Sequence, residues 1–301
     1  MGANGCLACF ITHSKLLLLM LICLPVWSQT NPPKLIDCHV HHNGSVAFLE
    51  RLLARLSSVS GEAMLITAPK DLAQVTTFMQ QHPGRLIGLG EIELDAPDVL
   101  NTIDQFHVAG FRGLGEISRP QYTYDDRRYW PIYQRAEQYG MLLLFHTGIV
   151  NRTHPEIAQD VDSDRMRVSR LDLVARRFPK LTIIGAHLGN PDYAWAGEIG
   201  RWNPNLYFDV SGSTLMKKQE DYPIFKSIFW WSSVASPHTP KSSASAFEKL
   251  VFGSDVFEGD LDEFDGALDR YHRMLDACGV SAGAQANIFS GTLWRILNQN
   301  R

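Results

Sequence analysis

Short runs of apolar residues alternate along this chain with stretches in which apolar residues recur at helical spacing. This alternation is typical of βα units that build a parallel sheet. The apolar runs predict strands at about residues 34–40, 62–68, 85–90, 110–116, 141–146, 181–187, 205–210 and 249–254. The other stretches predict helices at 45–57, 70–82, 97–108, 128–139, 168–178, 192–202, 261–278 and 284–298. Because a closed (β/α)8 barrel needs eight strands, we expect a distorted, single-domain α/β barrel of the TIM type over residues 34–298.

The N-terminal leader differs from the rest of the chain. Lys15 precedes the apolar run 16–24, and small residues occur within 26–28. The run is too short for a membrane span, which needs about 20 apolar residues. A basic flank, a short apolar core and a cleavage region are typical of an export signal. We therefore expect residues 1–28 to be a signal peptide and the mature protein to be periplasmic or secreted, with anchoring at Cys23 as the less favoured alternative.

The composition of the chain indicates which kinds of molecule the protein is expected to bind. The chain has 301 residues, of which 20% are charged, with a formal net charge of −4 and no run of basic residues. Nothing therefore indicates nucleic acid binding, and a small-molecule substrate is expected. No segment after the leader is apolar enough to span a membrane, and the sequence leaves a homo-oligomer open. Cys38 and Cys278 are expected to be buried thiols, and alternation with His39 places Cys38 on the helix-facing side.

Side chains that bind metals follow several of the predicted strands. Parallel strands collect their carboxyl ends at one mouth of a barrel, so these side chains should meet there. Imidazoles together with carboxylates favour zinc, with manganese or iron as alternatives, over calcium or magnesium. Each residue alone also has a structural interpretation, for example Asp255 as a helix cap. The candidates, in chain order, are His39, His41, Glu116, His146, His187 and Asp255.

The segments that carry these residues resemble the amidohydrolase superfamily, in its amidohydrolase-related branch of hydrolases and non-oxidative decarboxylases. The resemblance covers residues 34–298 and rests on motifs such as Asp37-Cys38-His39-Val40-His41, Phe145-His146-Thr147-Gly148, Gly185-Ala186-His187-Leu188-Gly189 and Gly253-Ser254-Asp255. It implies a (β/α)8 barrel that binds one or two divalent metal ions. One departure is that Val256-Phe257 follows Asp255, where the branch often has an aromatic residue and a proline.

The resemblance also implies roles for the candidate residues. His39, His41, His146 and Asp255 are implied as metal ligands, and Asp255 also as the general base. His187 is implied either as an acid–base group or as a ligand of a second metal. Glu116 either bridges two metals or has a structural or substrate-facing role, because the bridging lysine of the family is not evident here. We favour a single metal on this basis.

These roles predict a metal-dependent hydrolase that uses a metal-activated water on a small amide, lactone or ester. The alternative is a metal-dependent non-oxidative decarboxylase, a carbon–carbon lyase, of a small aromatic or enoic carboxylic acid. In that case an arginine of the mouth-side loops could hold a second carboxylate of the substrate, although any one of these arginines taken alone is more readily interpreted as a solvated surface charge. A third alternative is a non-catalytic binding protein that has kept the barrel. The loop arginines in question are Arg119, Arg152, Arg165 and Arg167.

Overall fold

The computed structural model describes residue 1 and residues 31–150 and 161–299, so the expected signal peptide and Arg152 lie outside the described residues. Its centre is a seven-stranded parallel sheet in which every strand pairs with the next one along the chain. The strands are β1 (Leu35–His41), β2 (Gly61–Thr67), β3 (Leu86–Gly90), β4 (Gly113–Ile117), β5 (Leu142–Phe145), β6 (Ile183–Gly185) and β7 (Leu206–Phe208). The sheet curls as in a TIM-type barrel, which confirms the predicted α/β class.

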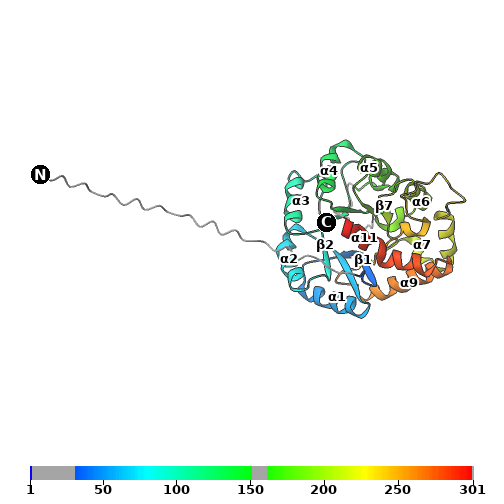
Figure 1. The fold of residues 1–301 in the computed structure, drawn as a ribbon, viewed down its shortest axis with the longest axis horizontal. Coiled ribbons are helices and arrows are strands. Elements are labelled where there is room, and N and C mark those ends of the chain that lie inside the picture. Colours follow the sequence, from blue (N-terminus) through cyan, green and yellow to red (C-terminus); the bar gives the residue numbers. More distant parts are fainter. Residues whose placement is uncertain (2–30, 151–160, 300–301) are drawn as a thin grey trace.

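Helices surround the sheet, and α1 to α6 follow one another around its outside (Figure 1). They are α1 (Val46–Ser58), α2 (Leu72–Gln81), α3 (Val99–Val108), α4 (Trp130–Gln138), α5 (Leu171–Arg177), α6 (Tyr193–Trp202), α7 (Thr214–Lys217), α8 (Phe225–Ile228), α9 (Glu263–Ala277), α10 (Ala282–Ala286) and α11 (Thr292–Gln299). The predicted last helix at 284–298 is thus divided, with a π-helical segment at Asn287–Gly291 between α10 and α11. No helix among the described residues has the length and apolar character that a membrane span requires.

The predicted eighth strand is only partly regular. Residues 250–256 lie between β7 and β1, joined by single bridges that pair Phe208 with Leu250 and Val40 with Val256. The segment still donates from Val251 N to Phe208 O at 2.9 Å and accepts at Phe252 O from Cys38 N at 2.9 Å. It therefore links the two outer strands of the sheet and closes the ring, although it forms no continuous ladder.

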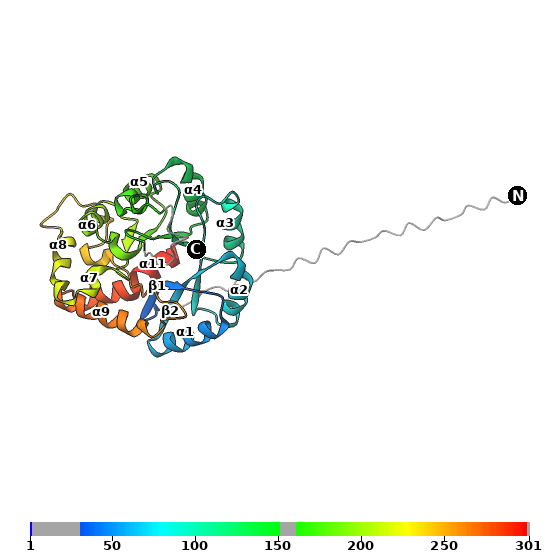
Figure 2. The same cartoon turned by 180° about the vertical axis from the view of Figure 1, so that it is seen from behind.

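The last helix, α11, closes the amino ends of the strands. Leu293 and Leu297 pack in the cluster of inward-facing strand residues that includes Met64. Arg112, directly before β4, donates to Leu297 O at 2.9 Å. Viewed from either side of the molecule, α11 lies near the centre of the ring of helices (Figures 1 and 2). The opposite, carboxyl ends of the strands are therefore the end available for a site.

A β-bulge in β1 corrects one expectation. Between Asp37 and Val40 this strand has one residue more than β2. The extra residue reverses the alternation, as bulges do. Cys38 consequently faces inward in the cluster of Met64, not toward the helices, while Val40 faces the helices. Cys38 and Cys278 are both buried and free, as predicted.

Glu62, near the amino end of β2, is a buried carboxyl that the sequence analysis did not identify. It lies on the same face of the strand as Met64 and is 2% exposed. Neither of its oxygens has a hydrogen-bond partner among the described residues. Burial raises the pKa of Glu62 from 4.5 to about 8, against a smaller opposing effect of Arg85. A carboxyl in this position is therefore mostly protonated at neutral pH.

The raised pKa of Glu62 predicts a pH-dependent stability. Between pH 4.5 and 8 the unfolded state loses this proton while the folded state keeps it, so the free energy of unfolding should fall as pH rises. The slope due to this group is at most about 1.4 kcal/mol per pH unit. Glu62→Gln should remove this contribution from urea unfolding curves measured across the range, whereas the exposed control Glu50→Gln should not. Identical slopes in Glu62→Gln and the wild-type protein would contradict the assignment.

Candidate metal centre

The first two candidate ligands extend from the end of β1. The bulge turns Val40 toward the helices, so His39 and His41 on either side of it both face the mouth, as predicted. Their Nε2 atoms lie 3.1 Å apart. His39 is fully buried, whereas the side chain of His41 is 33% exposed. The pair therefore offers two imidazole nitrogens directed at one point, one from inside the protein and one from the cavity side.

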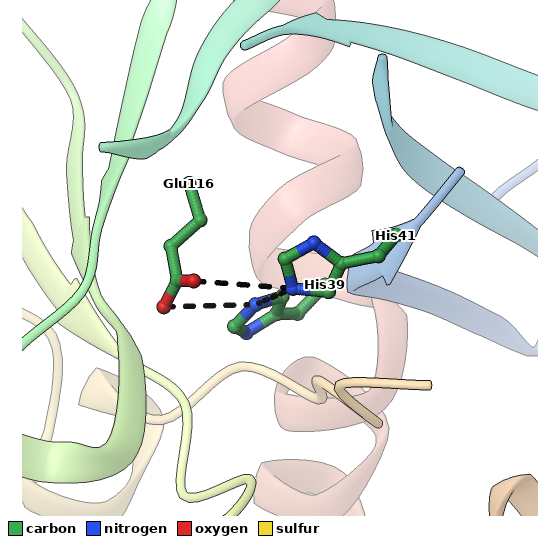
Figure 3. A group of neighbouring side chains, drawn as sticks. All are labelled: His39, His41 and Glu116. Carbon is green, nitrogen blue, oxygen red and sulfur yellow. Dashed lines mark hydrogen bonds and ion pairs between the residues drawn. The ribbon is translucent and has the colours of Figure 1, made fainter. Parts of the chain in front are cut away.

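Glu116, from β4, lies at the centre of the cluster. Its Oε1 is 3.0 Å from His146 Nδ1 and 3.2 Å from His187 Nε2. The same oxygen is 3.8 Å from His39 Nε2, and Oε2 is 3.9 Å from His41 Nε2 (Figure 3). One carboxylate thus lies within reach of all four histidines.

His146 and His187 follow β5 and β6. His146 comes directly after Phe145, the last residue of β5, and His187 lies in a short 3-10 turn, Ala186–Gly189, with φ of 62°. Their ring centroids are 4.7 Å apart. His187 Nδ1 donates to Ser211 O at 2.7 Å, which leaves Nε2 directed at Glu116. His146 Nε2 is buried and has no partner among the described residues.

Asp255 is brought to the centre by the irregular eighth segment. Its backbone N donates to His39 O at 2.8 Å, and its φ of 62° is uncommon for a residue with a side chain. Oδ1 lies 3.3 Å from both His39 Nε2 and His41 Nε2. Gly212 adjoins it, where a Cβ would be 3.2 Å from Asp255 Oδ2 and 3.1 Å from His187 Nδ1. A side chain at position 212 would therefore press against both groups.

Asp209 is a site residue that the sequence analysis missed. It follows β7 and is fully buried, and its Oδ2 accepts from His39 Nδ1 at 3.0 Å. Its Oδ1 accepts from His187 N at 3.1 Å and from Ser211 Oγ at 2.6 Å. The available signal was that Asp209, like the other candidates, directly follows a short apolar strand.

Asp37, two residues before His39 on β1, holds the backbone next to the metal-binding candidates His39 and Asp255. Its Oδ1 accepts from His39 N and Ser254 N, both at 3.0 Å. Burial raises the pKa of Asp37 to about 7, with hydrogen bonds from Ser254 and His39 acting in the opposite direction. The carboxyl joins β1 to the eighth segment, which is a structural role.

The cluster strongly attracts positive charge. Burial lowers the pKa of His39, but Asp255, Asp209 and Glu116 outweigh it and bring the value to about 10. His187 behaves in the same way, with burial opposed mainly by Glu116, and its pKa is about 9. Burial likewise fails to raise the pKa of Glu116, which His146 and His187 hold well below its usual range. The carboxylates thus stabilise either protons or a cation among the imidazoles.

The donor atoms form two overlapping groups. Within each, one atom from each residue lies within 4.8 Å of the others, and Glu116 belongs to both: His39, His41 and Glu116, and Glu116, His146 and His187. Asp255 adjoins the first group through its contacts with His39 and His41. Nitrogen and carboxylate donors of this kind suit zinc, manganese or iron, provided that the imidazoles are neutral. The residues present therefore fit a divalent metal, and the buried, unpartnered His146 Nε2 agrees with this.

A cavity of about 530 Å³ opens above the cluster. This volume is in the usual range for a small-molecule site. Arg165 and Arg167 are not among the described residues that line it; they donate to Pro120 O and Asp192 respectively. The lining includes Glu116, Arg119, His146, His187, Lys217 and Asp255.

Comparisons with known structures find the same fold. A probable 2-pyrone-4,6-dicarboxylic acid hydrolase from Acinetobacter baumannii, solved with citric acid bound, is 14% identical with a TM-score of 0.59, over 88% of this chain and 99% of its own. An uncharacterised TIM-barrel protein from Bordetella bronchiseptica has the same identity, TM-score and coverage. A TatD homologue from Escherichia coli K12 is 14% identical with a TM-score of 0.53, over 89% of this chain and 96% of its own.

Sequence comparisons identify a family but no individual relative. No curated protein matches this chain. The family model for amidohydrolases, by contrast, matches residues 36–296, which include all the residues of the cluster and every strand residue except Leu35. With histidines and acidic residues gathered at the carboxyl ends of its parallel strands, the chain belongs to the amidohydrolase family.

Proposed function

We propose that this protein is a metal-dependent hydrolase that cleaves a small amide, lactone or ester. The observation that carries the proposal is the position of Glu116, which lies between two histidine pairs, with Asp255 beside one of them. A binding protein without catalysis would not need a carboxylate open to the cavity next to such a cluster. The name of the Acinetobacter neighbour points in the same direction, because a 2-pyrone is a cyclic ester.

We further propose that the cluster holds two divalent ions that share Glu116. His39 and His41, with Asp255, would hold one ion, and His146 and His187 the other. This differs from the single metal favoured by the sequence analysis. The reason is that His146 groups with His187 and not with His39 and His41. When bound, a divalent metal supplies Lewis acidity, which lowers the pKa of water at the site to about 7 and polarises a carbonyl group.

The protein's own residues handle the proton. Asp255 is 29% exposed and lies at the cavity. As an ionised carboxylate it can accept a proton from the attacking water as the oxygen joins the carbonyl carbon. The bond to the leaving nitrogen or oxygen then breaks, and Asp255 returns the proton to that atom. Water is consumed and two products leave through the cavity.

A substrate panel tests the reaction class. The purified protein, with its metal content measured, should release acid from at least one small lactone, ester or amide, and Asp255→Asn should reduce kcat by roughly 10²–10⁴, which is the usual contribution of a positioned acid–base group. Carbon dioxide release from aromatic or enoic acids without hydrolysis of the panel would instead select the decarboxylase. Activity unchanged in Asp255→Asn would remove this residue from the mechanism.

The shared carboxylate predicts the metal stoichiometry. The native protein should bind about two equivalents, and Glu116→Gln should bind one or fewer, because the amide lacks the charge that two ions would share. Metal content by elemental analysis after dialysis measures this. The matched control is Glu91→Gln, since Gly88-Leu89-Gly90-Glu91 repeats the sequence around Glu116 but Glu91 is exposed.

His187 distinguishes the two metal arrangements. With two ions, His187→Asn should lose about one equivalent. With a single ion on the other ligands it should keep its full metal content and lose only turnover. One equivalent in the native protein, unchanged in His187→Asn, would overturn the two-metal proposal.

Asp209 should control metal affinity through His39. The carboxylate accepts the Nδ1 proton of that ring, so Nε2 keeps the lone pair that a metal needs. Asp209→Asn should weaken metal binding about 10- to 100-fold in chelator competition, the usual effect of removing such a partner. Nitrogen-15 NMR of the imidazoles should show a changed protonation pattern at His39.

Asp37→Asn, at a second buried carboxyl that accepts from the backbone N–H groups of His39 and Ser254, is the control for lost stability without lost affinity. Equal affinities in Asp209→Asn and the wild-type protein would contradict this role.

A further inference from the structure

Arg119 differs from the other arginines of the described chain. Its guanidinium forms no hydrogen bond, ion pair or ring contact with any described residue. Every other described arginine has at least one such contact. Arg119 nevertheless lines the cavity above Glu116 and Asp255. Arg119 is exposed, so water can satisfy its five N–H donors, and no described protein acceptor competes with an anionic group that enters the cavity.

The backbone holds Arg119 in this place at some cost. Its φ is 49°, in the left-handed region that residues with side chains rarely adopt. The backbone N donates to Met166 Sδ at 3.2 Å, which ties this loop to the segment before α5. Arg119 follows Glu116 by only three residues. The end of β4 thus contributes the carboxylate at the floor of the cavity, and the loop that follows it contributes a cation on the wall.

Lys217 supplies a second cation to the same cavity. It is the last residue of α7 and is exposed, and its ammonium forms no ion pair or hydrogen bond with the described residues. The carboxylates of the cavity do not neutralise either cation. Glu116 is engaged with His146 and His187, and Asp255 with His39 and His41. The wall therefore carries two positive charges that have no partner among residues 31–150 and 161–299, while the acidic side chains that line the cavity lie at its floor.

We infer that the substrate carries a carboxylate away from the bond that is cleaved, and that Arg119 and Lys217 bind it. This inference rests on the proposed function for the location of the reacting bond. A guanidinium presents two parallel N–H groups that match the two oxygens of a carboxylate, whereas an ammonium acts as a point charge. Arg119 therefore orients the substrate and Lys217 adds attraction. A neutral amide or ester would leave both cations unpaired in the complex.

Calorimetric binding of simple probes tests the inference without requiring turnover. Benzoate should bind the purified, metal-containing protein more tightly than benzamide, which has nearly the same shape but no charge. Arg119→Gln should weaken benzoate binding roughly 10- to 100-fold, as expected for a charge-assisted pair, and should leave benzamide unchanged. Lys217→Gln should weaken it less. Arg128→Gln, on the same loop but ion-paired with Asp126, is the matched control and should bind like the wild-type protein.

The outcomes separate this inference from the proposed function. Benzoate affinity unchanged in Arg119→Gln, at equal metal content, would mean that the carboxylate binds at the metal centre alone, and would overturn the inference while leaving the hydrolase proposal intact. Phenylphosphonate bound more tightly than benzoate through Arg119 would overturn the choice of a carboxylate. Loss of benzoate binding in Arg119→Gln would support the subsite even if the substrate panel showed no hydrolysis.

Discussion

The geometry of the centre depends on one buried carboxylate, Asp209. Burying an ionised group is costly unless its oxygens are fully hydrogen-bonded, and Asp209 meets this condition with the ring of His39, the backbone of His187 and the hydroxyl of Ser211. These groups come from the ends of β1, β6 and β7. Because they must all face the same carboxylate, the positions of two imidazoles from distant parts of the chain become coupled.

Irregular backbone surrounds this carboxylate, and it occurs where the chain delivers functional groups. His187 and Asp255 both have φ of 62°, and Arg119 has φ of 49°. Such conformations persist only when the surrounding structure holds them, and they tend to cluster at functional sites. The regular strands below supply that support. The eighth segment forms no continuous ladder with its neighbours, and within it Asp255 reaches the Nε2 atoms of His39 and His41.

Charge is arranged in layers along the cavity. Acidic and imidazole groups occupy the floor, where a metal fits, and two cations to which the described part of the chain gives no partner occupy the wall. This separation allows the same small volume to attract a divalent cation and an anionic group without the two sites competing. It also provides an axis along which a substrate with distinct ends can be oriented, which is a large part of what an enzyme contributes to rate.

The sequence by itself determined the barrel and most of the cluster. Apolar runs place seven strands within a few residues of their observed bounds, and a ligand after a strand must lie at the mouth because parallel strands share one end. The tertiary structure alone decided the rest. The alternation of side chains along β1 could not reveal the bulge that turns Cys38 inward. An extra residue changes which face of the sheet the side chains point to, but it does not change the apolar pattern of the sequence. Nor could the alternation reveal that Asp209 holds His39, or that Glu116 lies between two histidine pairs. Those facts depend on distances between side chains far apart in the chain, and such distances are set only when the ring of strands closes.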